Sequence, residues 1–304
     1  QPTSSGVSSV VQNIGKVSNK GVEIELNYDL IKQKDWKASF GANATFVKNK
    51  IINLPETMKE NGYINGTKKW MEGKSIYEFW LRQWYGVNPT NGDGLYYLDT
   101  DQYNEAAGTL TTSVKNSIVE INGKTLTNSY SYAKYDFSGR AIPTMYGGFN
   151  FKVGYKAFDL SAIFSYQLGG KVLDSNYQTL MSMSNFGYSM SKDVLKAWQK
   201  EGDVTNIPRL DNNSTHATNI GATSTRWLIS SDYLNLRSVN LGYEFPKDLL
   251  AKVMIKSARL NLTAENLFML KKRQGLNPMA NYSGLTYNEY MPTRNFTIGL
   301  NVSF

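Results

Sequence analysis

The segment FDLSAIFSYQL at Phe158–Leu168 alternates apolar and polar side chains, except that Ile163 stands on the polar parity. One parity is apolar from Phe158 to Leu168, and the other carries Asp159, Ser161 and Ser165. A period of two predicts a β-strand with one buried face, because successive side chains point to opposite sides of a strand. The length matches the ~9–11 residues that a tilted strand needs to cross a bilayer.

The same alternation recurs at residues 22–30, 36–46, 149–155, 258–268 and 296–304. Two weaker segments, 75–87 and 233–245, fit less well, and a bulge near Arg237 reconciles the second with the pattern. We predict roughly nine strands, with the apolar parity facing lipid and the polar parity facing a hydrated lumen. The expected lipid-facing set includes Leu26, Phe40, Phe164, Leu260 and Ile298.

The connections between these segments differ systematically in length. Residues 31–35, 88–94, 156–157 and 246–256 form short connections, whereas 50–74, 101–143, 170–232 and 269–293 form long ones. Short turns on the periplasmic side and long loops outside the cell are typical of outer-membrane barrels, so we expect a periplasmic C-terminus. An odd number of antiparallel strands cannot close on itself. We therefore expect the C-terminal part of a larger barrel, with Gln1 outside the cell.

Composition excludes several classes of protein. The 304 residues hold no Cys and one His, which removes disulfides, thiol catalysis and most imidazole sites. No apolar run reaches the ~18–20 residues of a membrane helix. The net charge of +8 comes from dispersed basic residues, so nucleic-acid binding is not expected. The one dense basic cluster, Lys271, Lys272 and Arg273, is expected to meet lipopolysaccharide phosphates at the surface of the outer membrane.

Seven stretches follow one another along nearly the whole chain: NIGKVSNKGVEIELNY (13–28), EGKSIYEFWLRQWYGVNPTNGDGLY (72–96), GRAIPTMYGGFNFKVGYKAFDLSAIFSYQLGGKV (139–172), AWQKEGDVTNIPRL (197–210), SSDYLNLRSVNLGYEFP (230–246), SARLNLTAENLF (257–268) and MPTRNFTIGLNVSF (291–304). In this order they resemble the C-terminal half of SusC/RagA-type TonB-dependent transporters of Bacteroidetes outer membranes. One departure is at residues 233–236, where YLNL stands in place of the basic–aromatic signature that the family often has.

The resemblance implies an all-β fold, in which residues 1–304 form the C-terminal part of one barrel domain of about 22 strands. The N-terminal plug and the segment that contacts TonB would be absent from this chain. The family imports glycans or peptides with energy relayed by TonB, and it works with a SusD-like surface lipoprotein as a lid. Outer-membrane lipid and a glycan or peptide substrate are further expected partners.

Aromatic residues in the long loops are the candidate ligand contacts. They can stack on sugar rings or contact a peptide, although girdle residues and loop packing are the more usual roles of such side chains. The candidates are Trp70, Tyr96, Tyr97, Tyr103 and Trp198. Residues 191–200 read as a short helix in which Val194, Leu195 and Trp198 share a face. The loop 170–232 is the expected docking segment for the lipoprotein, because it is the longest loop.

Catalysis, cofactors and metal ions are not expected. His216 reads as a solvated loop residue rather than a general base. The oxygen-rich segment 88–101 lacks the spacing of a calcium loop, and its Asn-Gly and Asp-Gly pairs favour a hairpin turn.

The resemblance also implies that assembly machinery reads the last strand as a signal. Leu300, Val302 and Phe304 continue one apolar face to the terminal carboxylate, and an unpaired strand edge can add to a template. Three alternatives stay open at this point: a free-standing barrel acting as an adhesin or passive porin, a soluble β-sandwich or glycan-binding module, and a barrel enzyme resting on His216.

Overall fold

The computed structural model describes residues 6, 15–106, 108–183, 187–287 and 289–304. Within these residues the largest sheet has seven strands in the order β1-β2-β11-β12-β15-β16-β17, and each neighbouring pair is antiparallel. Its strands are β1 (Lys16–Lys32), β2 (Trp36–Asn53), β11 (Met145–Tyr155), β12 (Phe158–Leu168), β15 (Tyr233–Glu244), β16 (Ser257–Lys271) and β17 (Asn295–Ser303). We call it the main sheet.

The register of the main sheet keeps the apolar parity of every strand on one face. A single row of directly opposite residues crosses all seven strands: Tyr28, Phe40, Phe151, Ala162, Val239, Ala264 and Phe296. A slip of one residue in any pair would send that strand's apolar side chains to the polar face, so the pattern itself specifies the register. The bulge expected near Arg237 is confirmed, because the register of β15 shifts between Leu236 and Ser238 against β16.

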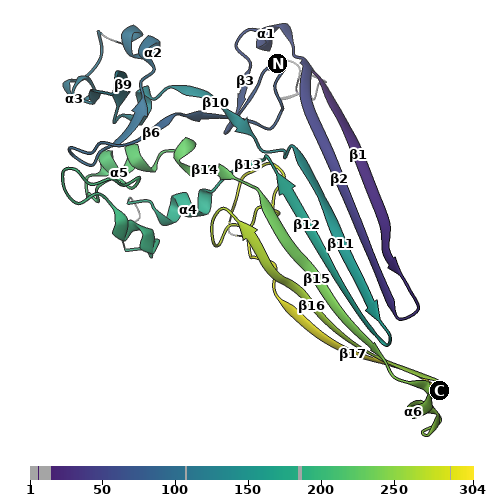
Figure 1. Cartoon of the computed structure of the whole chain (residues 1–304). Coiled ribbons are helices and arrows are strands. Elements are labelled where there is room, and N and C mark those ends of the chain that lie inside the picture. Colours follow the sequence, from purple (N-terminus) through teal and green to yellow (C-terminus); the bar gives the residue numbers. More distant parts are fainter. Residues whose placement is uncertain (1–5, 7–14, 107, 184–186, 288) are drawn as a thin grey trace.

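The two ends of the main sheet differ, as Figure 1 shows. At one end lie the tight turns, the short helix α6 (Lys247–Ala251) and the carboxyl end of the chain. At the other end the three long connections, residues 54–144, 169–232 and 272–294, gather beside the strand ends. We call these three segments together the loop lobe.

The loop lobe has secondary structure of its own. One four-stranded sheet has the order β10-β5-β4-β3, another has the order β6-β7-β9-β8, and β13 pairs with β14. The strands are β3 (Tyr63–Asn65), β4 (Lys68–Trp70), β5 (Glu78–Arg82), β6 (Trp84–Val87), β7 (Gly94–Tyr97), β8 (Ile118–Ile121), β9 (Lys124–Thr127), β10 (Tyr135–Arg140), β13 (Lys171–Leu173) and β14 (Leu228–Ser230). The α-helices are α1 (Glu56–Lys59), α2 (Thr100–Glu105), α3 (Thr112–Lys115), α4 (Ser175–Leu180) and α5 (Ser214–Gly221), and the 3-10 helices are η2 (Tyr130–Tyr132), η3 (Lys192–Lys196) and η4 (Thr225–Trp227).

The hydrophobic core lies in the loop lobe rather than in the main sheet. Its buried members come from the first two segments of the lobe, residues 54–144 and 169–232. They are Phe79, Leu81, Ala141, Leu173, Met181, Val194, Ala197, Ile207 and Trp227. Leu285 of the last segment packs against this cluster. The long connections are therefore a folded unit whose segments hold one another.

Three expectations about secondary structure are wrong. Residues 75–87 do not form a strand of the main sheet, because β5 and β6 belong to two different sheets of the loop lobe. The count is therefore seven strands within the described residues and not nine. The helix expected at 191–200 is the shorter 3-10 helix η3, which begins after the capping residue Ser191. Leu195 and Val204 of this region are fully exposed or nearly so.

The main sheet is open. Among the described residues β1 pairs only with β2 and β17 only with β16, so each edge offers a row of unpaired backbone groups. A barrel that spans a membrane must satisfy these groups, and therefore the chain forms part of a larger barrel. No helix in the described part of the chain is long and apolar enough to cross a bilayer.

Candidate functional site

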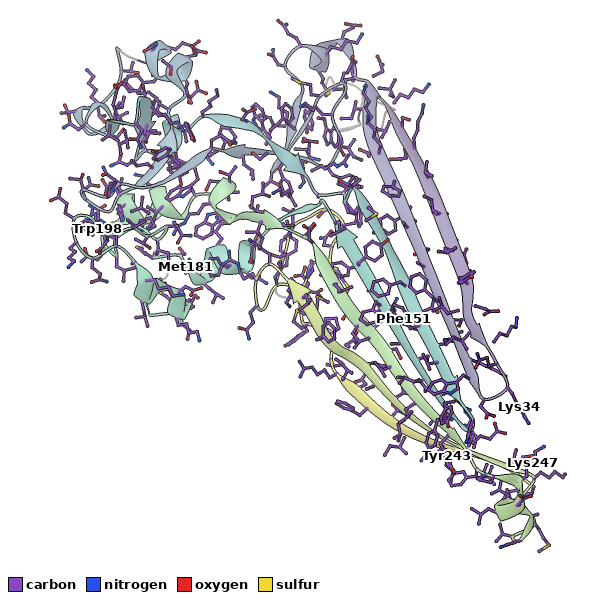
Figure 2. The ribbon with its side chains drawn as sticks, in the orientation of Figure 1. Lys34, Phe151, Met181, Trp198, Tyr243 and Lys247 are labelled. Atoms are coloured by element: carbon purple, nitrogen blue, oxygen red, sulfur yellow. The ribbon has the colours of Figure 1, made fainter. Side chains whose placement is uncertain are left out.

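The apolar face of the main sheet has the height of a bilayer core. On β2 the apolar parity runs from Trp36 to Phe46, which is about 33 Å along a strand at ~3.3 Å per residue. A strand tilt of ~40° reduces this to about 25 Å, the usual height of the apolar band of an outer-membrane barrel. Figure 2 shows Phe151 near the middle of the main sheet and Lys34 and Lys247 at the turn end.

Aromatic rings line the turn end of this band. Trp36 packs on Tyr155 with ring centroids 4.3 Å apart, and Phe158 packs on Tyr243 at 4.5 Å. Phe245 adds an edge contact to Tyr243 at 5.0 Å. Such rows are typical of the interfacial girdles of membrane barrels, because the rings suit the headgroup level.

The polar face carries cross-strand hydrogen bonds instead. Asn240 Nδ2 donates to Thr263 Oγ1 at 2.7 Å, and Arg259 Nη2 donates to Asp159 Oδ1 at 2.6 Å. At the edge, Asn295 Nδ2 donates to Glu265 Oε2 at 3.2 Å. These polar groups can hydrogen-bond to water or to a ligand, whereas the opposite face is apolar along the band from Trp36 to Phe46 on β2.

Gly41 allows a close approach on the polar face. A Cβ at this position would lie 2.6 Å from Asn150 Nδ2 and 2.7 Å from Asn27 Oδ1. The two amide side chains therefore close over a glycine that has no side chain to oppose them. A side chain at position 41 therefore costs more stability than its place on the polar face alone would suggest, although the ends of the two amide side chains can rotate away.

The loop lobe contains a polar cavity of about 550 Å³. Its lining comes from β7, the turn before η2, and the segment that leads into α5, and it includes Asp93, Asn128, Tyr130, Arg209, His216 and Asn219. Charged and amide side chains converge here from segments more than a hundred residues apart in sequence, as with Arg209 and Asp93.

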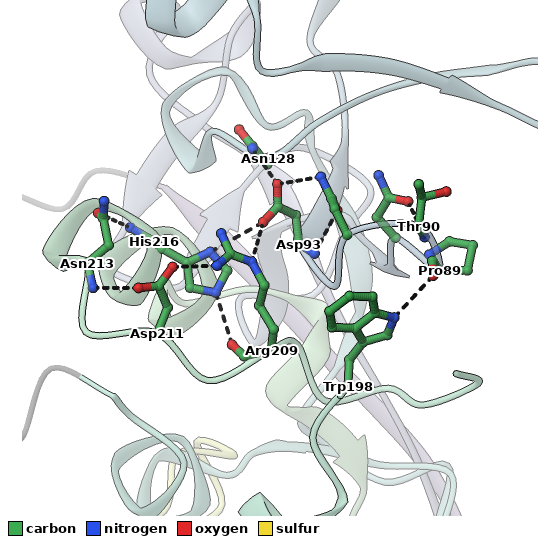
Figure 3. A network of polar contacts seen from close by, with 11 residues as sticks. Pro89, Thr90, Asp93, Asn128, Trp198, Arg209, Asp211, Asn213 and His216 are labelled. Atoms are coloured by element: carbon green, nitrogen blue, oxygen red, sulfur yellow. Dashed lines mark hydrogen bonds and ion pairs between the residues drawn. The ribbon is translucent and has the colours of Figure 1, made fainter. Parts of the chain in front are cut away.

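Asp93 is the centre of the polar network beside this cavity (Figure 3). Its Oδ1 accepts from Arg209 Nε at 3.1 Å, and its Oδ2 accepts from the amides of Asn91 and Asn128, both at 3.1 Å. Arg209 Nη1 reaches Asp211 Oδ2 at 2.5 Å. The carboxylate of Asp93 is almost buried, so these donors replace the water that it gives up on folding. Sequence patterns gave no signal for this network.

His216 closes the network and is not the solvated loop residue that we expected. It lies on α5, and its side chain is 10% exposed. Its Nε2 lies 3.1 Å from the backbone oxygen of Arg209, and its Nδ1 lies 3.6 Å from Asp93 Oδ1. The ring therefore fixes the segment 209–216 against β7 and its preceding turn. With one ring nitrogen on a backbone oxygen, His216 has a structural role in this arrangement.

The turn expected within residues 88–101 is confirmed. β6 pairs with β7, and the Gly92 amide donates to Asn88 O at 2.8 Å. Trp198 packs over this turn, because its Nε1 donates to Pro89 O at 3.1 Å and a Cβ at Gly92 would collide with the indole. Trp198 is thus bound to the β6–β7 hairpin rather than to a helix of its own, and Figure 3 shows it beside Pro89.

The other candidate aromatics have different surroundings. Tyr96 is fully buried, and its hydroxyl donates to Asn219 O at 2.5 Å, so it offers no surface to a ligand. Burial raises the pKa of Tyr96 to about 12. The remaining three are half-buried, and each ring contacts another: Trp70 with Tyr63, Tyr97 with Tyr85, and Tyr103 with Tyr132.

Two buried cations were not singled out from the sequence. Arg226 lies between the rings of Trp84 and Trp227, with its guanidinium carbon 4.9 and 4.3 Å from their centroids, and burial lowers its pKa to about 10. Lys68 Nζ lies 2.8 Å from the ring centroid of Phe79 without a hydrogen-bond partner in the described part of the chain. Desolvation lowers the pKa of Lys68 to about 7.

The basic cluster at 271–273 does not form one surface patch. Lys271 Nζ donates to Leu276 O at 2.6 Å, and Arg273 pairs with Asp174 at 3.1 Å and covers the ring of Tyr177. Only Lys272 stays exposed. The expectation that all three meet lipid phosphates is therefore wrong. Across the described residues, no three His, Asp or Glu side chains are grouped to hold a metal ion.

The chain is similar in sequence to known receptor proteins. No protein-family model matches the chain. TonB-dependent receptor P3 of Formosa agariphila is 29% identical over 100% of this chain and 30% of its own length. TonB-dependent receptor SusC of Bacteroides thetaiotaomicron is 25% identical over 98% of this chain and 27% of its own length. The chain thus spans about a third of the length of the relatives that it matches.

A solved structure shares the fold. The structure of the RagAB peptide transporter superposes with a TM-score of 0.78 and 24% identity, over 100% of this chain and 31% of the other. The sequence matches cover essentially the whole chain, and the open seven-stranded sheet agrees with a partial barrel. The chain is therefore similar over its whole length to part of TonB-dependent receptors, SusC among them, and it shares the partial-barrel fold of the solved peptide transporter.

Proposed function

We propose that this chain supplies wall and outer loops to an outer-membrane importer of oligosaccharides or peptides that is energised through TonB. The observation that carries the proposal is a sheet with an apolar face about 25 Å high and a hydrogen-bonded polar face, continued at one end by a folded lobe with a polar cavity. The relatives named for TonB dependence and the peptide transporter of the same fold support it. The parts that contact TonB would lie outside this chain.

The orientation that fits this function puts the loop lobe outside the cell and the carboxyl end in the periplasm. Tight turns are typical of the periplasmic end of barrels and long loops of the outer end. Substrate arriving from outside would then meet the lobe first and pass along the polar face.

The substrate contacts that we propose are the accessible aromatics together with the polar cavity. Trp70, Tyr97 and Tyr103 keep part of their ring surface exposed, and Trp198 stands at the β6–β7 turn next to Arg209. Rings stack on sugars or on apolar side chains, and amides and charges orient a polar chain.

A SusD-like lipoprotein is the proposed lid, and the loop 170–232 is its proposed docking segment. Three apolar side chains of this loop are more than three-quarters exposed on the lobe surface: Tyr188 at 76%, Leu195 at 81% and Val204 at 100%. Exposed apolar side chains of one segment favour a protein contact, because burial against a partner removes them from water.

Point substitutions test the docking proposal better than a loop deletion. Deleting 181–218 would remove Met181, Val194, Ala197 and Ile207 from the core of the lobe. The variant Leu195→Ser with Val204→Ser leaves that core intact. Co-purification of the lipoprotein with this variant of the full transporter should fall severalfold, and Leu249→Ser at the turn end is the matched control. Equal recovery with both variants would contradict docking through this loop.

Uptake by cells tests the transport function itself. Cells that carry the full transporter as their only copy are given labelled peptides and labelled oligosaccharides, with and without TonB. Uptake of one class that disappears without TonB supports the proposal and names the cargo. Uptake that is unaffected by loss of TonB would favour a passive porin instead. The variants Tyr97→Ala and Tyr103→Ala should raise the half-saturating substrate concentration while leaving the barrel inserted.

A further inference from the structure

Two lysines lie directly opposite each other on the apolar face of β1 and β2. Lys20 pairs with Lys48 in the register that also pairs Val22 with Phe46, so both lysines share the face of the apolar band. Lys50 follows on the same face of β2, opposite Ser18. All three side chains are exposed. Like charges directly opposite in an antiparallel pair repel each other and destabilise it.

In the described part of the chain, no carboxylate pairs with these three lysines. The residues outside the described set, 1–5, 7–14, 107, 184–186 and 288, include no Asp or Glu in the sequence. The opposite face of β1 and β2 at this level carries no lysine. Asn49 donates a hydrogen bond to Asn19 there, and Ile51 is buried against the loop lobe.

The depth of the pair along the strand points to the headgroup layer. Phe46 belongs to the last apolar row, which continues through Met145 to Leu168. Lys48 lies two residues farther, about 7 Å along the strand and about 5 Å in depth at a tilt of ~40°. The headgroup region on each side of a bilayer is ~5–8 Å thick, so the ammonium groups reach the level of lipid phosphates.

We propose that Lys20 and Lys48, with Lys50 beside them, bind the phosphate of a phosphorylated glycolipid of the outer leaflet. An anion between the two ammonium groups turns their repulsion into two attractions, and the acyl chains of the same molecule lie along the Val22–Phe46 row below. The proposal rests on the membrane orientation given above, and it assigns the lipid contact to β1 and β2 rather than to residues 271–273.

Lipid retention by the purified full transporter tests this site. The protein is placed in zwitterionic phospholipid nanodiscs that contain either bisphosphorylated lipid A or the same glycolipid with its phosphates removed, and native mass spectrometry counts the glycolipid retained after washing. The wild-type protein should retain the phosphorylated form. Lys20→Gln with Lys48→Gln should weaken retention about tenfold to thirtyfold, whereas Lys20→Arg with Lys48→Arg should keep it.

The control carries the same charge change on the polar face, as Lys37→Gln with Lys152→Gln, and it should retain the phosphorylated glycolipid like the wild type. Heat-modifiable gel mobility confirms that each variant is folded. Equal retention by the Lys20 and Lys48 double variant, or equal retention of the glycolipid without phosphates by the wild type, would overturn the proposal. This measurement does not depend on cargo uptake. A transporter that lacks this lipid site but imports normally would refute the site alone, and retained lipid without uptake would refute the import function alone.

Discussion

The face assignment of the main sheet is tested by placing an arginine at Ala162. This residue lies in the row that joins Phe151 on β11 to Val239 on β15, and its small side chain makes the substitution one of added charge rather than lost packing. On β12 the apolar band runs from Phe158 to Leu168, so Ala162 is about one residue, or ~3 Å along the strand, from the middle of the band.

The expected cost follows from that depth. Arginine at the midplane of the lipid-facing surface of a barrel costs about 2–4 kcal/mol, and Ala162→Arg should fall in this range. The adjacent Ser161 points to the polar face between Lys152 and Asn240. Ser161→Arg therefore adds only a like charge opposite Lys152, which costs about 0.2–1 kcal/mol.

Urea unfolding of the full transporter in lipid vesicles gives both free energies of unfolding, with gel mobility of the unheated protein as the measure of the folded fraction. The difference between the two variants is the decisive quantity, because both carry the same added charge one residue apart. If Ser161→Arg cost as much as Ala162→Arg or more, the assignment of the apolar face to lipid would be refuted.

Three further predictions concern the loop lobe and the last strand. Lys68→Met should stabilise the lobe at pH 6 by up to a few kcal/mol, because the charged ammonium is disfavoured in the fold and its pKa falls from 10.5 to about 7. The gain should shrink as the pH rises from 7 towards 10.5, where the unfolded lysine also loses its proton, and hydrogen exchange of β4 and β5 measures it; a gain that does not depend on pH would contradict the reasoning. Arg209→Ala should raise hydrogen exchange in the β6–β7 turn by an amount that corresponds to about 1–3 kcal/mol, since it leaves Asp93 without its ion pair, while Lys196→Ala at an exposed pair should change little. Deleting Phe304 should slow insertion into the membrane and leave the inserted protein with near-normal heat stability if the strand is an assembly signal; a loss of ~1.5–3 kcal/mol in the inserted protein would indicate a seam contact instead, and normal insertion with normal melting would contradict both.

The strands of the main sheet were predictable because their information is local. Alternation with a period of two fixes which side chains share a face, and one buried or lipid-facing side then allows a single register. For this reason the segment Phe158–Leu168, the bulge at Arg237 and the shared apolar parity of Leu26 and Ile298 could be read from the sequence. The segment 75–87 failed because its aromatic residues also suit a buried lobe strand, and local alternation does not distinguish these two environments.

The sequence by itself therefore determined the strands of the main sheet and the two faces that they share. Only the tertiary structure decided the lobe. Asp93 forms an ion pair with Arg209, and the side chain of His216 is almost buried beside Asp93. Arg273 pairs with Asp174 instead of joining a basic surface patch. In each case the partner lies far away in the sequence. The physical reason is that the two faces of a strand of the main sheet meet different environments, so that apolar and polar residues alternate along its sequence. A folded loop is instead held by single long-range contacts, which leave no local pattern in the sequence.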